Sequence, residues 1–187
     1  PSTLARTVRF VLTDGDGGTS GAVTKTINVV GDHTLYVTTG SDTVDGVTTS
    51  IDALLANRGI DGMISLREAI LATNATANSG GPDRICFNIA GTGVHTINIA
   101  STLPTITEQL IIDATTDDSF ATNSNRPAII LDGNNLAADG LTLGATADGS
   151  TIRGLVIRDF GGNGILVAAG SDNNIIAGNY IGRLTSS

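Results

Sequence analysis

Residues 139–143 read Asp-Gly-Leu-Thr-Leu, and residues 163–167 read Asn-Gly-Ile-Leu-Val. The two stretches match at an offset of 24 residues, and the match continues further along the chain, where Ile152 aligns with Ile176. A fixed period of about 20–50 residues is typical of solenoid proteins, in which each repeat buries its apolar side only against its neighbours. The repeat therefore predicts an extended stack of short elements.

Short apolar runs separated by Gly, Asn, Asp and Thr fill the second half of the chain, as expected of many short strands joined by tight turns. Inward Ile, Val and Leu side chains would stack on like residues one repeat away. We therefore predict an all-β fold, a right-handed parallel β-helix of about 24 residues per rung with an N-terminal β-hairpin and one capping α-helix. The expected strands are 85–89, 94–99, 110–112, 129–131, 141–143, 152–157, 165–167 and 175–181.

One segment has the signature of a helix. Ser65 and Glu68 have the spacing of a capping box, and apolar residues follow at helical intervals until Gly80. The pattern predicts a helix over about 65–78. Such a helix, placed just before the strands, would cover the exposed core of the first rung; the alternative is a helix packed on the side of the stack.

The N-terminal segment predicts a β-hairpin. Residues 7–13 and 23–29 are rich in Val, Thr and Ile, and a Gly-rich turn separates them. The turn offers Asp14 and Asp16 as candidate Ca²⁺ ligands, since Ca²⁺ prefers carboxylate oxygens; the ordinary alternative is a pair of solvated turn residues. A hairpin alone is marginal in water, so it must pair with another element or chain.

Composition and charge exclude several classes of function. The chain has 187 residues, a net charge of −8 and no basic stripe, which argues against a nucleic-acid partner. No apolar run approaches the ~18 residues that a membrane span needs. The single cysteine, Cys86, lies in an apolar run and reads as a buried, inert thiol rather than a nucleophile.

The segment 61–70, Asp-Gly-Met-Ile-Ser-Leu-Arg-Glu-Ala-Ile, resembles a family of bacterial surface proteins named for the motif Cys-Ser-Leu-Arg-Glu-Ala, with Ile64 in place of the Cys. Later stretches fit the same series of motifs. They are 83–87, 102–106, 131–133, 151–157 and 177–182. The resemblance covers about residues 60–183. It implies a right-handed parallel β-helix from a large secreted or surface-attached bacterial protein.

The same resemblance bears on neighbouring segments and on the motif residues. The hairpin resembles the last two strands of cadherin-like and other immunoglobulin-like repeats, which lie beside such β-helices. We expect Arg67 to pair with a carboxylate and Glu68 to complete the helix cap, both as structural groups. The expected organisation is a hairpin over 1–30, a linker and helix-capped start over 31–83, and the β-helix over 84–187.

Right-handed β-helices include polysaccharide lyases and hydrolases, so a catalytic role is an alternative. A glycosidase needs two carboxylates flanking the scissile bond, and a lyase needs Asp ligands for Ca²⁺ and a basic residue. The candidate acids are Asp113, Asp117, Asp118, Asp132, Asp139 and Asp159, and the candidate bases are Arg126, Arg153 and Arg158. Short connections leave too little wall to enclose a sugar chain, so we predict no enzymatic activity, no catalytic residue and no required cofactor.

The two ends of the chain suggest a role. The last expected strand ends at Ile181 without a following cap, and an uncapped edge pairs readily with other strands. Either the chain is cut from a longer protein, or it is a subunit whose hairpin pairs with the open edge of the next copy. We predict a secreted structural or adhesive protein of a bacterial surface or matrix, partnered by copies of itself or adjacent domains. The alternatives are a glycan-binding or glycan-cleaving protein, with polysaccharide as the partner, and an inert spacer.

Overall fold

The computed structural model describes residues 6–13, 15–27 and 33–182, and these residues fall into two compact units. Unit 1 lies within Pro1–Asp32 and unit 2 within His33–Ser187. In unit 1, β1 (Arg6–Phe10) pairs antiparallel with β2 (Val23–Ile27) in a two-stranded sheet. Thr24 lies opposite Arg9, and Lys25 lies opposite Val8. The expected hairpin is therefore present, with shorter strands than the sequence suggested.

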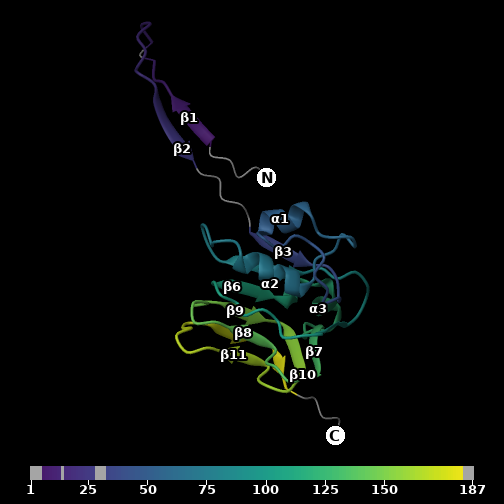
Figure 1. Cartoon of the computed structure of the whole chain (residues 1–187). Helices are drawn as coiled ribbons and strands as arrows, with labels where there is room; N and C mark the ends of the chain where they lie inside the picture. The colour runs from purple at the N-terminus through teal and green to yellow at the C-terminus, as the bar shows by residue number, and fades with distance from the viewer. Residues whose placement is uncertain (1–5, 14, 28–32, 183–187) are drawn as a thin grey trace. The chain divides into compact units, whose positions relative to one another are not determined.

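Unit 2 holds eleven strands in three parallel sheets (Figure 1). The five-stranded sheet has the order β12-β9-β6-β4-β3, the four-stranded sheet β13-β10-β7-β5, and the third pairs β11 with β8. Their bounds are β3 Thr34–Val37, β4 Asp83–Phe87, β5 His95–Asn98, β6 Leu110–Asp113, β7 Ile129–Leu136, β8 Leu141–Leu143, β9 Thr151–Arg153, β10 Leu155–Phe160, β11 Ile165–Val167, β12 Ile175–Ala177 and β13 Tyr180–Ile181.

Three α-helices and a 3-10 helix accompany the strands. They are α1 (Ile51–Ala56), α2 (Leu66–Asn74), α3 (Asp118–Thr122) and η1 (Ala114–Thr116). Helix α2 begins at the predicted capping box and ends a few residues before the predicted end. In Figure 1, α1 and α2 lie beside β3 at one end of unit 2, and β11 lies at the other end.

The predicted fold class is wrong. The described part of the chain has mixed α/β content with separate parallel sheets, and no closed or solenoid sheet is among them. The chain is therefore not an all-β protein with one capping helix. Helices α1 and α3 were missed because six and five residues are too few to show an apolar period. Their signals are the caps Ser50 and Asp117, whose side chains accept from the first-turn N–H groups.

Two apolar rows run across the large sheets and form much of the core. Leu35, Ile85, Ile112 and Ile152 occupy paired positions in the five-stranded sheet, and each is at most 1% exposed. The side chains of Ile97, Leu131 and Ile157 form the matching row in the four-stranded sheet and are all fully buried. Each strand therefore buries the apolar face of the strand beside it.

Glycine sets the bends that divide the last strands. Gly154 separates β9 from β10 with a φ of +78°, and Gly178 separates β12 from β13 with a φ of +63°. This left-handed region strains residues that carry a Cβ. A Cβ at Gly154 would also lie 2.7 Å from the Thr115 side chain. The chain turns sharply between sheets at both positions, so the expected single strands 152–157 and 175–181 are each two strands.

Candidate functional site

The apolar rows end on strands whose side chains are exposed. Ile176 pairs with Ile152 but is 41% exposed, and Ile181 pairs with Ile157 but is 49% exposed. Every residue of β12 and of β13 is exposed. We call β11, β12 and β13 together the terminal edge. Each earlier strand is covered by the strand next to it. The terminal edge instead exposes apolar side chains at the edges of the sheets, where further strands could pair.

Polar side chains hold the turns of this region in a 24-residue register. The Asp139 carboxylate accepts the backbone N–H of Asn163 at 2.6 Å, and the Asp148 carboxylate accepts that of Asp172 at 2.7 Å; both pairs are 24 residues apart. Asp139 and Asp148 therefore each support the turn that lies 24 residues further along the chain. Asp172 is exposed, and its own carboxylate has no partner among the described residues.

Asparagine side chains make equivalent bonds in the opposite direction along the chain. The Asn174 carbonyl oxygen accepts the N–H of Ser150, and the Asn179 carbonyl oxygen accepts that of Leu155, again 24 residues apart. The matched positions of the repeat thus meet in space. Side chains of the terminal edge support the strand before it and leave their own outer faces to solvent.

Two of the candidate bases form ion pairs with candidate acids. Arg153 does not meet Asp132; its guanidinium donates to Asp113 instead, while Asp132 accepts two bonds from Arg158 at 2.8 and 3.1 Å. Asp159 also lies 3.7 Å from Arg158. Both acid–base pairs are therefore ion pairs within the fold. The hollow beside Arg158 and Asp159 measures about 120 Å³, well below the roughly 300–1,000 Å³ of pockets that take drug-sized ligands.

The other candidates have local structural positions. Asp117 is buried and caps α3, Asp118 lies in the first turn of that helix, and Asp139 supports the turn at Asn163. Arg126 is exposed. Cys86 is buried, as expected. None of these placements sets two carboxylates across a groove from each other.

Asp113 accepts hydrogen bonds from two side chains, those of Thr115 and Arg153. Burial alone would raise its pKa, but hydrogen bonds from Arg153 and Thr115 outweigh burial, so the pKa of Asp113 lies below its ordinary value. The same contact raises the pKa of Arg153. Arg84 lies 3.7 Å from Asp113 on the other side. Sequence reasoning missed Arg84, because Asp113 and Arg153 are 40 residues apart and do not follow the 24-residue repeat.

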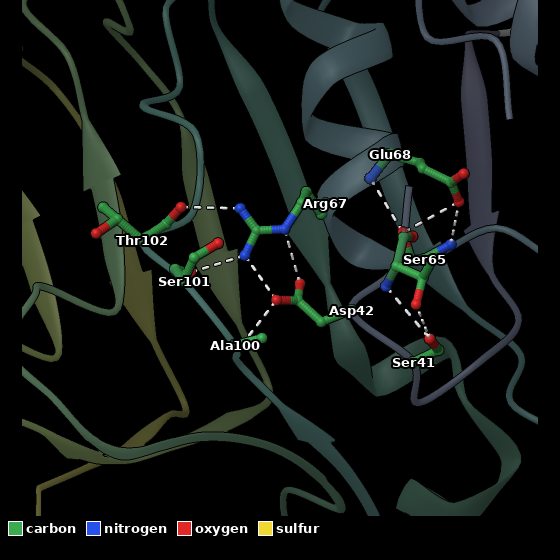
Figure 2. A network of polar contacts seen from close by, with 9 residues as sticks. Ser41, Asp42, Ser65, Arg67, Glu68, Ala100, Ser101 and Thr102 are labelled. Atoms are coloured by element: carbon green, nitrogen blue, oxygen red, sulfur yellow. Dashed lines mark hydrogen bonds and ion pairs between the residues drawn. The ribbon is translucent and has the colours of Figure 1, made fainter. Parts of the chain in front are cut away.

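The motif residues Arg67 and Glu68 have the structural roles expected of them (Figure 2). Arg67 makes two bonds to the Asp42 carboxylate, at 2.6 and 3.0 Å, and donates to the carbonyls of Ser101 and Thr102. Glu68 accepts the N–H of Ser65, which completes the capping box. Both predictions are confirmed, and the network ties α2 to segments on either side of it.

The candidate calcium ligands are only partly described. Asp14 lies outside the described residues, and Asp16 lies in the turn of unit 1. In the described ranges, no group of three or more His, Cys, Asp or Glu side chains could hold a metal ion. The Ca²⁺ hypothesis for Asp14 and Asp16 therefore stays a prediction.

Comparison with family models, with curated proteins and with solved structures finds no match to this chain. Within the residues that the structure describes, no helix is long and apolar enough to cross a bilayer.

Proposed function

We propose that this chain is a non-catalytic structural and adhesive module that associates through its terminal edge. The observation that carries the proposal is the contrast within each apolar row. Ile152 and Ile157 are 1% and 0% exposed, whereas Ile176 and Ile181, their paired neighbours, are 41% and 49% exposed. A further layer of strands would bury the second pair as it buries the first.

The partner we propose is the β1–β2 hairpin of a second copy. A two-stranded sheet is marginal in water on its own, and this one exposes Phe10, Leu12 and Val23. Its exposed Arg9 and Lys25 are opposite in charge to Asp172 at the terminal edge. Apolar contact and charge complementarity therefore favour the same pairing, in which one chain adds its strands to the sheets of the next.

Such a contact joins unlike surfaces, so it propagates from copy to copy and produces a filament unless the rotation between copies closes it into a ring. Placement at a bacterial surface or in an extracellular matrix rests on the resemblance of residues 61–70 to the surface-protein motif. The hairpin's own resemblance to the end of an immunoglobulin-like repeat is consistent with that location.

The test is negative-stain electron microscopy and light scattering of the whole chain over a range of concentrations. We expect filaments or a concentration-dependent rise in mass, and we expect Ile181→Asp to abolish it. Ile60→Asp is the matched control, because Ile60 is 100% exposed and lies outside the terminal edge. Deleting residues 1–32 should also abolish assembly. A monomer at every concentration, or assembly that survives both changes, would refute the proposal.

Addition of EDTA to the same samples tests the calcium hypothesis separately. If Asp14 and Asp16 bind Ca²⁺ in a way that orders the hairpin turn, filaments should shorten or disappear in EDTA and return with added Ca²⁺. Unchanged filaments would show that assembly does not require Ca²⁺, and the proposal for the terminal edge would stand.

A further inference from the structure

A second surface lies on the outward face of the five-stranded sheet. Tyr36 pairs with Cys86, Cys86 with Asp113, and Asp113 with Arg153, so the four residues form one row across β3, β4, β6 and β9. Successive side chains of a strand point to opposite faces. The adjacent positions hold the buried core row that begins at Leu35, so the row from Tyr36 to Arg153 faces outward.

Two arginines converge on the one carboxylate of this row. Arg153 donates Nη2 to Asp113 Oδ2, and the Nη2 of Arg84 lies 3.7 Å from the same oxygen. The Asp113 side chain is 2% exposed, whereas those of Arg84 and Arg153 are 41% and 48% exposed. The carboxylate therefore lies beneath two guanidinium groups that face solvent, and the cluster carries one surplus positive charge.

Within the residues that the structure describes, most N–H donors of these two guanidinium groups have no hydrogen-bond acceptor. A guanidinium has five N–H donors, and Asp113 is the polar partner of both arginines among the described residues. Arg67, in contrast, binds Asp42 and two carbonyls, and Arg158 contacts two aspartates. In the described part of the chain, two arginines share one carboxylate only here.

We propose that this face, formed by Tyr36, Arg84 and Arg153, binds an acidic oligosaccharide of uronic-acid type. The ligand's carboxylate would take bidentate hydrogen bonds from the guanidinium groups. The exposed ring of Tyr36 would pack on the apolar face of a neighbouring sugar ring. The distance from β3 to β9 is three strand spacings, about 14 Å, which exceeds one sugar ring.

The charge of the chain selects this ligand class over nucleic acid. The affinity of a protein for a polyphosphate depends on neutralising many charges at once, and this cluster offers two arginines in a chain of net charge −8. A uronic-acid chain carries one carboxylate per acidic sugar and also offers apolar ring faces. Two arginines and one tyrosine match a carboxylate that lies beside an apolar ring face. Arg153 lies on β9, next to β12 of the terminal edge. The proposed contacts use no residue of that edge, so they do not rest on the assembly proposal.

Isothermal titration calorimetry with a galacturonate trimer and with the neutral galactose trimer tests the proposal on the full chain. We expect saturable binding of the acidic trimer alone, which weakens with added salt. Arg84→Gln should reduce the affinity about tenfold through the loss of one charge-assisted hydrogen bond, and tenfold corresponds to about 1.4 kcal/mol. Tyr36→Ala should also weaken binding. Arg126→Gln removes an exposed arginine elsewhere and should leave the affinity unchanged.

Three results would overturn the proposal. The first is no binding of the acidic trimer at millimolar concentration, and the second is equal binding of the neutral trimer. The third is unchanged affinity in Arg84→Gln while its circular dichroism matches the parent; if that variant does not fold, Tyr36→Ala decides. An oligo-aspartate peptide that binds more tightly than the sugar, and loses affinity in Arg84→Gln, would assign the arginines to an acidic protein partner instead.

Discussion

Removing the Arg67 guanidinium should strongly destabilise unit 2. The side chains of Arg67 and Asp42 are only 12% and 5% exposed, so solvent screens this ion pair weakly. Arg67→Ala would delete both bonds to Asp42 and those to the carbonyls of Ser101 and Thr102 (Figure 2). Asp42 would keep the N–H of Ala100 as its one remaining donor from this network.

The expected magnitude follows from the cost of an uncompensated buried charge. Breaking a buried ion pair by removing one partner destabilises a protein by about 3–5 kcal/mol, a large share of the roughly 5–15 kcal/mol that stabilises a typical domain. Arg67→Lys keeps the charge but loses the forked geometry, and we expect a loss of about 1–3 kcal/mol. The double variant Arg67→Ala/Asp42→Ala should be less destabilised than Arg67→Ala alone, because no charge is left buried without a partner.

Urea denaturation followed by far-ultraviolet circular dichroism measures these differences, since the chain has no tryptophan. Arg158→Ala is the matched control, because the Arg158 side chain is 33% exposed and solvent screens its ion pairs. We expect that control to lose no more than about 1 kcal/mol. The reasoning would be refuted if Arg67→Ala lowered the free energy of unfolding by less than about 1 kcal/mol. It would also be refuted if the double variant were less stable than Arg67→Ala.

Three further predictions concern pH, packing and backbone approach. The folded-state pKa of Asp113 lies below its ordinary value of 3.8. The contribution of Asp113 to the free energy of unfolding is therefore present above pH 3.8 and is lost as the pH falls through the folded-state pKa. Asp113→Asn should reduce the loss of stability at low pH in denaturation curves measured from pH 7 to pH 2. Ile157→Ala should cost about 2–5 kcal/mol in urea denaturation, whereas Ile181→Ala, half exposed in the isolated chain, should cost about 1 kcal/mol or less; equal losses would contradict the burial contrast. Gly140→Ala should lower the melting temperature strongly, because its Cβ would lie 2.4 Å from the Gly164 carbonyl oxygen; an unchanged melting temperature would show that the turn can shift.

The capping box and the 24-residue match predicted local features well. Ser65 and Glu68 located the start of α2, because a cap depends on residues four positions apart at most. The matched residues Ile152 and Ile176 do pair in the structure. Both signals are short-range or strictly periodic, and such signals survive in a single sequence.

The fold class and the arginine cluster could not be obtained in the same way. The repeat covers only the C-terminal strands, whereas Asp113 and Arg153 meet across 40 residues that include α3 and η1. Helices of five or six residues carry no apolar period, and their existence depends on caps and tertiary packing. Extending the period of the last strands to the whole chain therefore overstated its regularity.

The unequal spacing of paired strands also has a consequence for the order of folding. Contacts near the terminal edge join residues 24 apart, whereas His33 meets Asp83 across 50 residues. Closing the longer loop costs only about 0.6 kcal/mol more in chain entropy, but contacts distant in sequence form more slowly than local ones. The C-terminal strands should therefore pair early in refolding, with β3 joining the sheet later. Pulsed hydrogen exchange would show this as protection that begins around β9 and β10 and reaches β3 last.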